Sequence, residues 1–369
     1  MTTAMTKQNV DMEKIRERLQ GAGGKIVLGI DGYIDSVWQI LASRTGPEEY
    51  ELYERMSNFS KTLSGCEEGG FSNEIIRKRR SYGGFTANTG KALTGLGVDL
   101  SMVGMFGKSS IDPVFEVFSG VGEFVSVGDP GLVTIYEFTD GKIMFVYTEE
   151  IMGFNWEAMT GTLDENRIKG IYSAADIIGL GYWSLMPAFD EIVTKICGLM
   201  KDNQKKQRIF FDFADIRKRD RESLESTLAL LFSLNMQIPM TLSLNEHEAA
   251  LLFSYYGETI AQEGEGAAAQ TEKIRKTIGI DELVVHTPYF STAASEYEGR
   301  CAAPQNYCTS PVITVGAGDH FNGGYMAAAL KGLDIEERLT VGNAVTSLYI
   351  SRGKSPSMQE LLAELEINY

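Results

Sequence analysis

One segment near the C-terminus combines small residues with an acid in a way that suits phosphoryl chemistry. Gly316, Ala317 and Gly318 precede Asp319, and an apolar run with helical character follows. The first N–H groups of a helix lack intrahelical partners and the helix dipole is positive there, so this turn could bind an anion. Asp319 could then take the proton from an attacking hydroxyl. An acid in the first helical turn after a glycine turn explains the segment equally well. A dinucleotide-binding GxGxxG is disfavoured, because Phe321 replaces its third glycine.

A second candidate follows a predicted strand at residues 240–244. Asn245 and Glu248 have the spacing of a capping box, in which Asn245 caps the next helix and Glu248 bonds back to it. That structural interpretation is the simpler one for this segment alone. The functional alternative is an oxygen site at the carboxyl end of a parallel strand, where Glu248 would order water around Mg²⁺.

Two further segments could contact a hydroxyl-bearing ligand. In the first, Gly83 and Gly84 would let a ligand approach the backbone, and Asn88 offers a donor and an acceptor. In the second, Asp31 and Asp35 follow a predicted strand at residues 25–30 and could accept hydrogen bonds from ligand hydroxyls. A tight turn with a capping asparagine and two solvated loop acids are the structural alternatives.

The elements that must position these residues follow an alternating pattern. Helical stretches separate short apolar runs that read as buried strands, at residues 25–30, 176–180, 208–213, 240–244 and 282–286. This alternation predicts a parallel sheet covered by helices on both faces. Hairpin signals at residues 128–131 and 140–141 separate runs at 123–127, 132–138 and 142–148, which predicts an antiparallel patch. The basic run at residues 77–80 is interpreted as a solvated helix face.

Composition limits the partners of the chain. Its 369 residues carry 50 acidic and 34 basic side chains, a net charge of −16, so a broad nucleic-acid-binding surface is not expected. No apolar run is long enough to cross a membrane, and the N-terminus does not resemble a signal peptide. Scattered cysteines without a CxxC motif predict reduced thiols and a cytoplasmic location. The three histidines lack the spacing of a metal site.

Taken together and in this order, the four segments resemble the ribokinase-like (PfkB) carbohydrate kinase family over about residues 25–355. The resemblance implies a single α/β domain over residues 1–369: a three-layer αβα sandwich with a mainly parallel sheet and a small antiparallel lid. The lid strands would come from about residues 33–40 and 123–148. It also implies phosphoryl transfer from ATP, with Mg²⁺, to a hydroxyl of a sugar-like molecule, and a possible homodimer through the lid.

The resemblance also implies roles for individual residues. Asp319 would be the base, with the backbone of Gly316, Ala317 and Gly318 as anion hole, and Glu248 would organise the metal. The remaining assignments divide between two ligands. Substrate contacts would come from Asp31, Asp35, Gly83, Gly84 and Asn88, and nucleotide contacts from Asn245, Thr287, Asn343 and Gly353.

Several positions depart from the family pattern. Ile313 stands where relatives carry an Asp that helps to hold a monovalent cation, which suggests an anion hole that works without that cation. Residues 43–80 form a longer segment than in ribokinase itself. The segments 136–141 and 285–289 look somewhat like those of ADP-dependent sugar kinases. A nucleoside kinase, an ADP-dependent sugar kinase and a catalytically silent ligand sensor therefore remain as alternatives.

Overall fold

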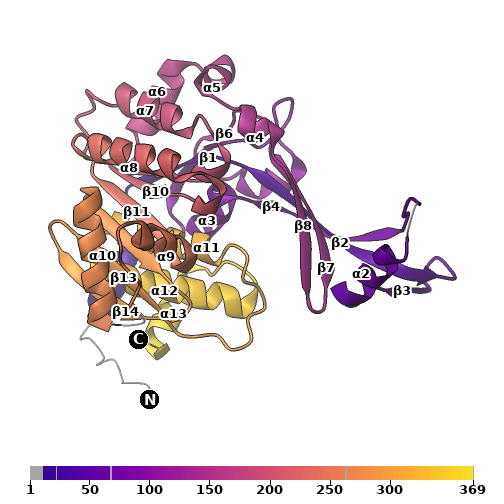
Figure 1. Cartoon of the computed structure of the whole chain (residues 1–369). Helices are drawn as coiled ribbons and strands as arrows, with labels where there is room; N and C mark the ends of the chain where they lie inside the picture. Colours follow the sequence, from indigo (N-terminus) through magenta and orange to yellow (C-terminus); the bar gives the residue numbers. More distant parts are fainter. Residues whose placement is uncertain (1–10, 22, 67–68, 262–263, 369) are drawn as a thin grey trace.

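Two β-sheets organise this computed structural model, which describes residues 11–21, 23–66, 69–261 and 264–368. Within these residues, the larger sheet has nine strands and carries helices on both faces, and the smaller sheet has five strands. Figure 1 shows the smaller sheet projecting from one side of the larger body. The predicted α/β class is confirmed by this arrangement.

The larger sheet is parallel through most of its width. Its order is β14-β13-β12-β11-β10-β9-β1-β5-β6, and only β13 and β14 run antiparallel to their neighbours. The bounds in chain order are β1 (Lys25–Ile30), β5 (Asp99–Gly104), β6 (Phe124–Ser126), β9 (Ile177–Leu180), β10 (Arg208–Asp212), β11 (Met240–Asn245), β12 (Glu282–His286), β13 (Phe290–Ser295) and β14 (Gly299–Pro304). Four predicted strands, at 25–30, 208–213, 240–244 and 282–286, match β1, β10, β11 and β12 to within one residue.

Helices cover both faces of this sheet, as the alternating pattern predicts. One apolar core lies under α5 (Trp156–Thr162), α6 (Glu165–Ser173), α7 (Phe189–Leu199), α8 (Arg221–Asn235), α9 (Glu246–Tyr255) and α10 (Gly264–Ile278). The other lies under α1 (Met12–Gln20), α3 (Phe85–Gly95), α11 (Ala317–Leu330), α12 (Ile335–Arg352) and α13 (Met358–Asn368). Burying both faces of the sheet favours the continuous apolar strands seen in the sequence.

The smaller sheet, called the lid below, is built around a long strand. In it β2 (Tyr33–Arg44) pairs antiparallel with β3 (Tyr50–Leu52) and β4 (Ile75–Gly83), and parallel with β7 (Gly131–Phe138). A hairpin joins β7 to the edge strand β8 (Gly141–Tyr147), and α2 (Met56–Ser64) lies at the outer end of the lid (Figure 1). The lid is thus a mixed sheet and not the purely antiparallel one that was expected.

Two local predictions were wrong, both because tertiary pairing decided the outcome. The run at residues 124–126 forms β6, which pairs parallel with β5 and belongs to the larger sheet instead of the lid. The basic run at residues 77–80 lies in β4 and not on a helix, since β2 supplies its backbone partners. Its charges are paired across the lid base: Arg80 bonds Asp112 at 2.7 Å and Lys78 bonds Glu137 at 2.7 Å.

Among the described residues, no helix combines the length and apolar character needed to cross a membrane.

A buried carboxylate ties the first strand to the start of α3. Asp31 directly follows β1 and is fully buried. Its Oδ1 accepts hydrogen bonds from the Thr86 backbone N–H at 2.9 Å and from the Thr86 hydroxyl at 2.6 Å. Gly84 closes the turn with a φ of +88°, and a Cβ added there would overlap Asp31 Oδ2. The turn therefore requires glycine for both its conformation and its space.

Replacing Gly84 by alanine should destabilise the protein strongly. The substitution adds a positive-φ penalty of about 1–2 kcal/mol and overpacks the buried carboxylate, which costs about 1–3 kcal/mol more. Gly97 is a matched control, because its φ is +69° and nothing lies within 4 Å of an added Cβ. Urea unfolding should therefore show a clearly larger loss for Gly84→Ala than for Gly97→Ala, and equal losses would contradict the steric argument.

Asp31 should also make stability depend on pH. Burial raises its pKa from 3.8 to about 7, against the opposing hydrogen bonds from Thr86. The folded state thus holds the proton more tightly than the unfolded state, and stability falls as pH rises from about 4 through 7. Asn at this position keeps an acceptor and cannot ionise. We expect Asp31→Asn to gain on the order of 2 kcal/mol relative to wild type between pH 5 and pH 8. A difference in unfolding free energy between Asp31→Asn and wild type that stays constant from pH 5 to pH 8 would refute this prediction.

Candidate active site

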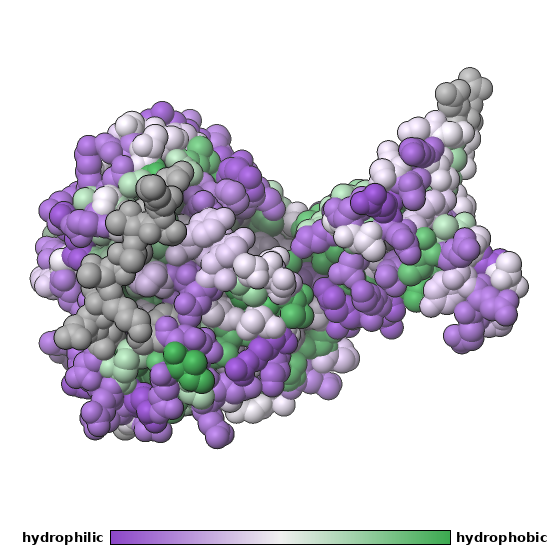
Figure 2. All heavy atoms as spheres, turned by 90° about the horizontal axis from the view of Figure 1, so that it is seen from below, coloured by the Kyte–Doolittle hydropathy of each residue, from purple (hydrophilic) through white to green (hydrophobic). Residues whose placement is uncertain are grey.

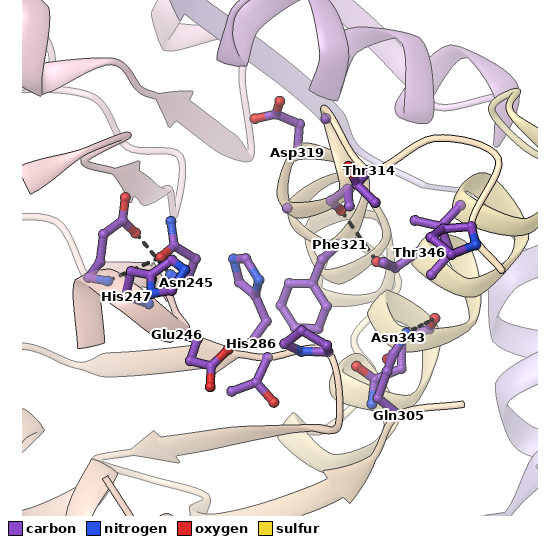
Figure 3. A pocket seen from close by; sticks show the side chains of 18 of the residues that line it. Asn245, Glu246, His247, His286, Gln305, Thr314, Asp319, Phe321, Asn343 and Thr346 are labelled. Carbon is purple, nitrogen blue, oxygen red and sulfur yellow. Dashed lines mark hydrogen bonds between the residues drawn. The ribbon is translucent and has the colours of Figure 1, made fainter. Parts of the chain in front are cut away.

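A cavity of about 650 Å³ opens at the carboxyl ends of the parallel strands. Figure 3 shows side chains from β11, β12, α9, α11 and α12 around it. Its walls combine acids, amides and glycine-rich backbone with a few rings: Phe85, Tyr182, Asp212, Asn245, Glu248, His286, Thr287, Gln305, Tyr307, Thr314, Gly316, Ala317, Gly318, Asp319, Asn343 and Thr346. The lid base joins the body close by, and Figure 2 shows a hollow between the body and the projecting lid.

Asp319 sits in the first turn of α11 at the wall of this cavity. Gly316 caps the helix in the left-handed conformation, with φ +81°, and Ala317 begins it. Asn88, from α3, donates its side-chain N–H to Asp319 Oδ2 at 2.9 Å. The two segments are 231 residues apart in sequence, and this bond fixes the carboxylate relative to the helix N-terminus. The structure thus places the Asp319 carboxylate at the glycine-rich start of α11.

Negative charge is concentrated around this carboxylate. Burial, reinforced by the neighbouring Asp212, raises the pKa of Asp319 well above its usual value, while the Asn88 bond acts in the opposite direction. Burial also raises the pKa of Asp212 to about 6. Asp212 ends β10, where it accepts hydrogen bonds from Ala214 N–H at 2.7 Å and from the Asn322 amide at 2.8 Å. The raised pKa values mean that Asp212 and Asp319 are stabilised by binding either a proton or a cation.

Asn245 and Glu248 form the capping box that their spacing predicts. Asn245 Oδ1 accepts the backbone N–H of Glu248 at 3.1 Å, and Glu248 Oε2 accepts that of Asn245 at 2.9 Å. The structural and functional interpretations are compatible, because among the described residues the buried Oε1 of Glu248 has no hydrogen-bond partner. Burial first, and then the charge of Asp212, raises the pKa of Glu248 well above its usual value.

This donor set fits Mg²⁺ better than a metal held by protein alone. In the described part of the chain, no group of three or more His, Cys, Asp or Glu residues could hold a metal ion. Mg²⁺ keeps several waters and binds through one or two carboxylates plus substrate phosphates. Glu248, with its unpaired oxygen, and Asp212 supply two such carboxylates at the cavity wall.

The expected substrate residues divide into two groups. Asp35, on the lid strand β2, lies against Gly83, since a Cβ added at Gly83 would meet its carboxylate at 2.9 Å. Burial first, and then the charges of Tyr33, Asp31, Asp319 and Asp35, raise the pKa of the Tyr182 hydroxyl well above its usual value, so all three acids lie within electrostatic range of this hydroxyl. Asp31 is different: it is fully buried, bonds Thr86 and does not line the cavity, and Gly84 shields it. The structure thus places Asp31 in the turn before α3 and not on the cavity wall.

The expected nucleotide residues also divide. Thr287 and Asn343 line the cavity. Each already has a backbone partner, however: the Thr287 hydroxyl donates to Phe290 O at 2.8 Å, and the Asn343 amide donates to Pro304 O at 3.0 Å. Gly353 lies outside the cavity wall and ends α12 with a φ of +70°. This C-cap position explains the glycine by its backbone conformation.

Two cavity residues were missed from the sequence. Asp212 ends an apolar strand, which is the same signal that identified Asp31, so it could have been found by that rule. Tyr182 could not have been found in this way. It has a φ of +74°, follows β9, and packs on Tyr33 of the lid with ring centroids 4.6 Å apart and ring planes tilted by 39°. That contact between body and lid depends on tertiary structure alone.

Comparisons with known proteins agree with this geometry. A family model described as prokaryotic ketohexokinase matches residues 2–368. A ketohexokinase from Haloferax volcanii is 25% identical over 358 residues, covering 95% of this chain and 92% of that protein. The match extends through both the body and the lid.

Solved structures show the same fold at lower identity. Ribokinase from Arabidopsis thaliana, solved with ribose and ATP, has a TM-score of 0.66 and 19% identity, and covers 94% of this chain and 100% of that one. A nucleoside kinase from Methanocaldococcus jannaschii has a TM-score of 0.60 and 15% identity, and the match covers 94% of this chain and 99% of that one. A phosphofructokinase-2 mutant from Escherichia coli has a TM-score of 0.61 and 15% identity, and the match covers 94% of this chain and 100% of that one. The chain is therefore a carbohydrate kinase of the ribokinase-like fold and belongs to the prokaryotic ketohexokinase family.

Proposed function

We propose that this protein transfers the γ-phosphoryl group of ATP to a hydroxyl of a ketohexose, with Asp319 as the general base. The observation that carries the proposal is the placement of the Asp319 carboxylate at the N-terminus of α11, held by Asn88 at 2.9 Å, on the wall of the cavity next to the lid. The family supports the acceptor, since its description and the Haloferax volcanii relative both carry the name ketohexokinase.

The chemistry needs one proton transfer and one displacement. Asp319 takes the hydroxyl proton as the sugar oxygen attacks the γ-phosphorus, the new O–P bond forms, and ADP leaves. Backbone N–H groups at Gly316, Ala317 and Gly318 and the dipole of α11 stabilise charge on the transferring group. Asn88 keeps Oδ2 occupied, which directs Oδ1 to the hydroxyl.

Glu248 and Asp212 are the residues that would hold Mg²⁺. When bound with the nucleotide, the ion neutralises phosphate charge and orients the phosphates. The crowded carboxylates make this charge balance favourable, because burial and then the charge of Asp212 raise the pKa values of both Glu248 and Asp319. Asn245 would keep Glu248 in place through the capping box.

The two ligands would occupy opposite ends of the site. Asp35, Gly83 and Asn88 lie toward the lid and would contact the sugar hydroxyls. Thr287 and Asn343 line the other end of the cavity and would border the nucleotide. On this proposal the lid and the body work as one kinase domain over the whole chain, and lid closure excludes water from the reaction. The free thiols of all four cysteines support a location in a reducing cytoplasm.

Asp319→Asn should abolish most turnover without unfolding the protein. Asn keeps the shape and the contact with Asn88 but cannot accept the proton, so kcat should fall by roughly 100-fold or more. A coupled assay with ATP and Mg²⁺ should compare fructose with ribose and a nucleoside, and ATP with ADP. Asp99→Asn is the matched control, since Asp99 is exposed at the start of β5.

Two results would contradict the proposal. Equal turnover in wild type and Asp319→Asn would exclude Asp319 as the base. A folded wild-type protein that phosphorylates a nucleoside or uses ADP in preference to fructose and ATP would assign the alternative activity. Absence of transfer to every acceptor would favour a ligand sensor.

We also propose that the lid forms a homodimer contact. Its edge strand β8 exposes apolar side chains, among them Phe145 at 62% and Tyr147 at 47%, and Leu132 of β7 lies beside them with 45% exposed. An apolar patch on an unpaired strand edge is unusual on a monomer and favours association.

Phe145→Asp should therefore weaken a wild-type dimer. Placing a charge in the apolar contact introduces a desolvation cost, and sedimentation velocity at micromolar concentration should show a shift toward monomer. Met236→Asp is the control, because Met236 is 75% exposed but lies at the end of α8. A monomeric wild type, or a dimer unaffected by Phe145→Asp, would rule out this contact.

A further inference from the structure

His320 directly follows the proposed base and takes no part in the chemistry described above. Its ring is only 2% exposed and stacks on the ring of Tyr349, with centroids 3.5 Å apart and planes 12° from parallel. Tyr349 belongs to α12, so this contact joins the helix that carries the base to its neighbour. Both side chains contact the Val315–Gly316 turn that leads into α11.

Both ring nitrogens of His320 are engaged. Nδ1 lies 2.8 Å from the carbonyl oxygen of Gly316, and Nε2 lies 2.7 Å from the hydroxyl of Ser355. A carbonyl oxygen can only accept a hydrogen bond, so Nδ1 carries the ring proton and donates a hydrogen bond to the Gly316 carbonyl. Nε2 then accepts a hydrogen bond from the Ser355 hydroxyl. Burial lowers the pKa of His320 to about 4, which keeps the ring neutral at ordinary pH.

Tyr349 holds the preceding peptide in the same way. Its hydroxyl donates to the carbonyl oxygen of Val315 at 2.8 Å. Two successive carbonyls, of Val315 and Gly316, are thus fixed by side chains that are stacked on each other. In a planar trans peptide the C=O and the following N–H point in opposite directions. Holding these carbonyls therefore also sets the directions of the N–H groups of Gly316 and Ala317.

The turn needs such restraint. Gly316 has a φ of +81°, and glycine reaches many other conformations at little cost. The turn has two backbone bonds, a long one from Ala317 N–H to Thr314 O at 3.2 Å and one from His320 N–H to Gly316 O at 3.0 Å. An anion hole stabilises a transition state only when its donors are already oriented. Two side-chain bonds to consecutive carbonyls supply orientation that the glycine-rich backbone lacks.

We propose that His320 and Tyr349 are positioning residues that clamp the Val315–Gly316 turn and so preorganise the anion hole beside Asp319. The inference rests on the proposed phosphoryl transfer at this site. It predicts that loss of either bond lowers kcat while the sugar KM stays nearly constant, because sugar binding on the lid side does not use the turn.

Two variants of His320 separate its hydrogen bond from its packing. His320→Phe keeps a ring to stack on Tyr349 but removes the donor to Gly316. His320→Asn loses the ring but places an amide N–H near the position of Nδ1. We expect kcat to fall about 10- to 100-fold in the Phe variant and only about fivefold or less in the Asn variant, with KM for the sugar within about threefold in both.

Tyr349→Phe tests the second bond with the ring stack intact. It should lower kcat about 10-fold or more, whereas Tyr297→Phe, at a side chain 81% exposed between β13 and β14, should leave it unchanged. Unfolding temperatures of all variants show whether each protein is folded at the assay temperature.

The inference is overturned if folded His320→Phe and Tyr349→Phe both keep wild-type kcat, or if His320→Asn loses as much kcat as His320→Phe. Failure of the inference about the His320 and Tyr349 clamp can be distinguished from failure of the proposed function. The latter requires a wild-type protein without sugar kinase activity or an active Asp319→Asn variant, whereas the clamp is tested only by comparison with an active wild type.

Discussion

Repulsion among carboxylates at one sheet edge is the constraint around which this site is built. Asp212, Glu248 and Asp319 come from three distant segments, and the first two end or follow parallel strands of the larger sheet. Burial raises the pKa of each, and the charge of Asp212 raises the pKa values of Glu248 and Asp319 further. The protein alone offsets this cost only in part, through amide donors such as Asn88. On the proposed function, a bound cation and the positive N-terminus of α11 would complete the charge balance.

Glycine conformation is the second constraint, and it acts at two turns on opposite sides of the base. Gly84 allows α3 to begin against the buried Asp31, which places Asn88 beside Asp319. Gly316 allows α11 to begin with its N–H groups toward the cavity. Both turns are flexible by composition and are held by side chains from other elements. Rigid donors around a glycine-rich backbone are what electrostatic catalysis requires.

The lid is joined to the body at its base and has a small core of its own at its outer end. Its base carries Asp35 and Tyr33, and Tyr33 packs on Tyr182 of the body. Its outer half has its own small core, in which Phe59 of α2 packs on Phe138 with ring centroids 5.8 Å apart. Strand β8 pairs with β7 on one side only, and in the described part of the chain its outer edge pairs with no other strand and carries exposed apolar side chains.

Local sequence determined the parts of this protein that depend on neighbours in the chain. Alternating apolar runs predicted the parallel sheet, and the spacing of Asn245 and Glu248 predicted a capping box, because both reflect backbone hydrogen bonding over a few residues. Only the tertiary structure decided which strand each run would join and which acids would meet. Asp31 and Asp35 look alike in sequence, yet one is buried behind a turn and the other faces the site. Residues 77–80 became a strand because β2 lies beside them, a pairing that local charge patterning does not encode.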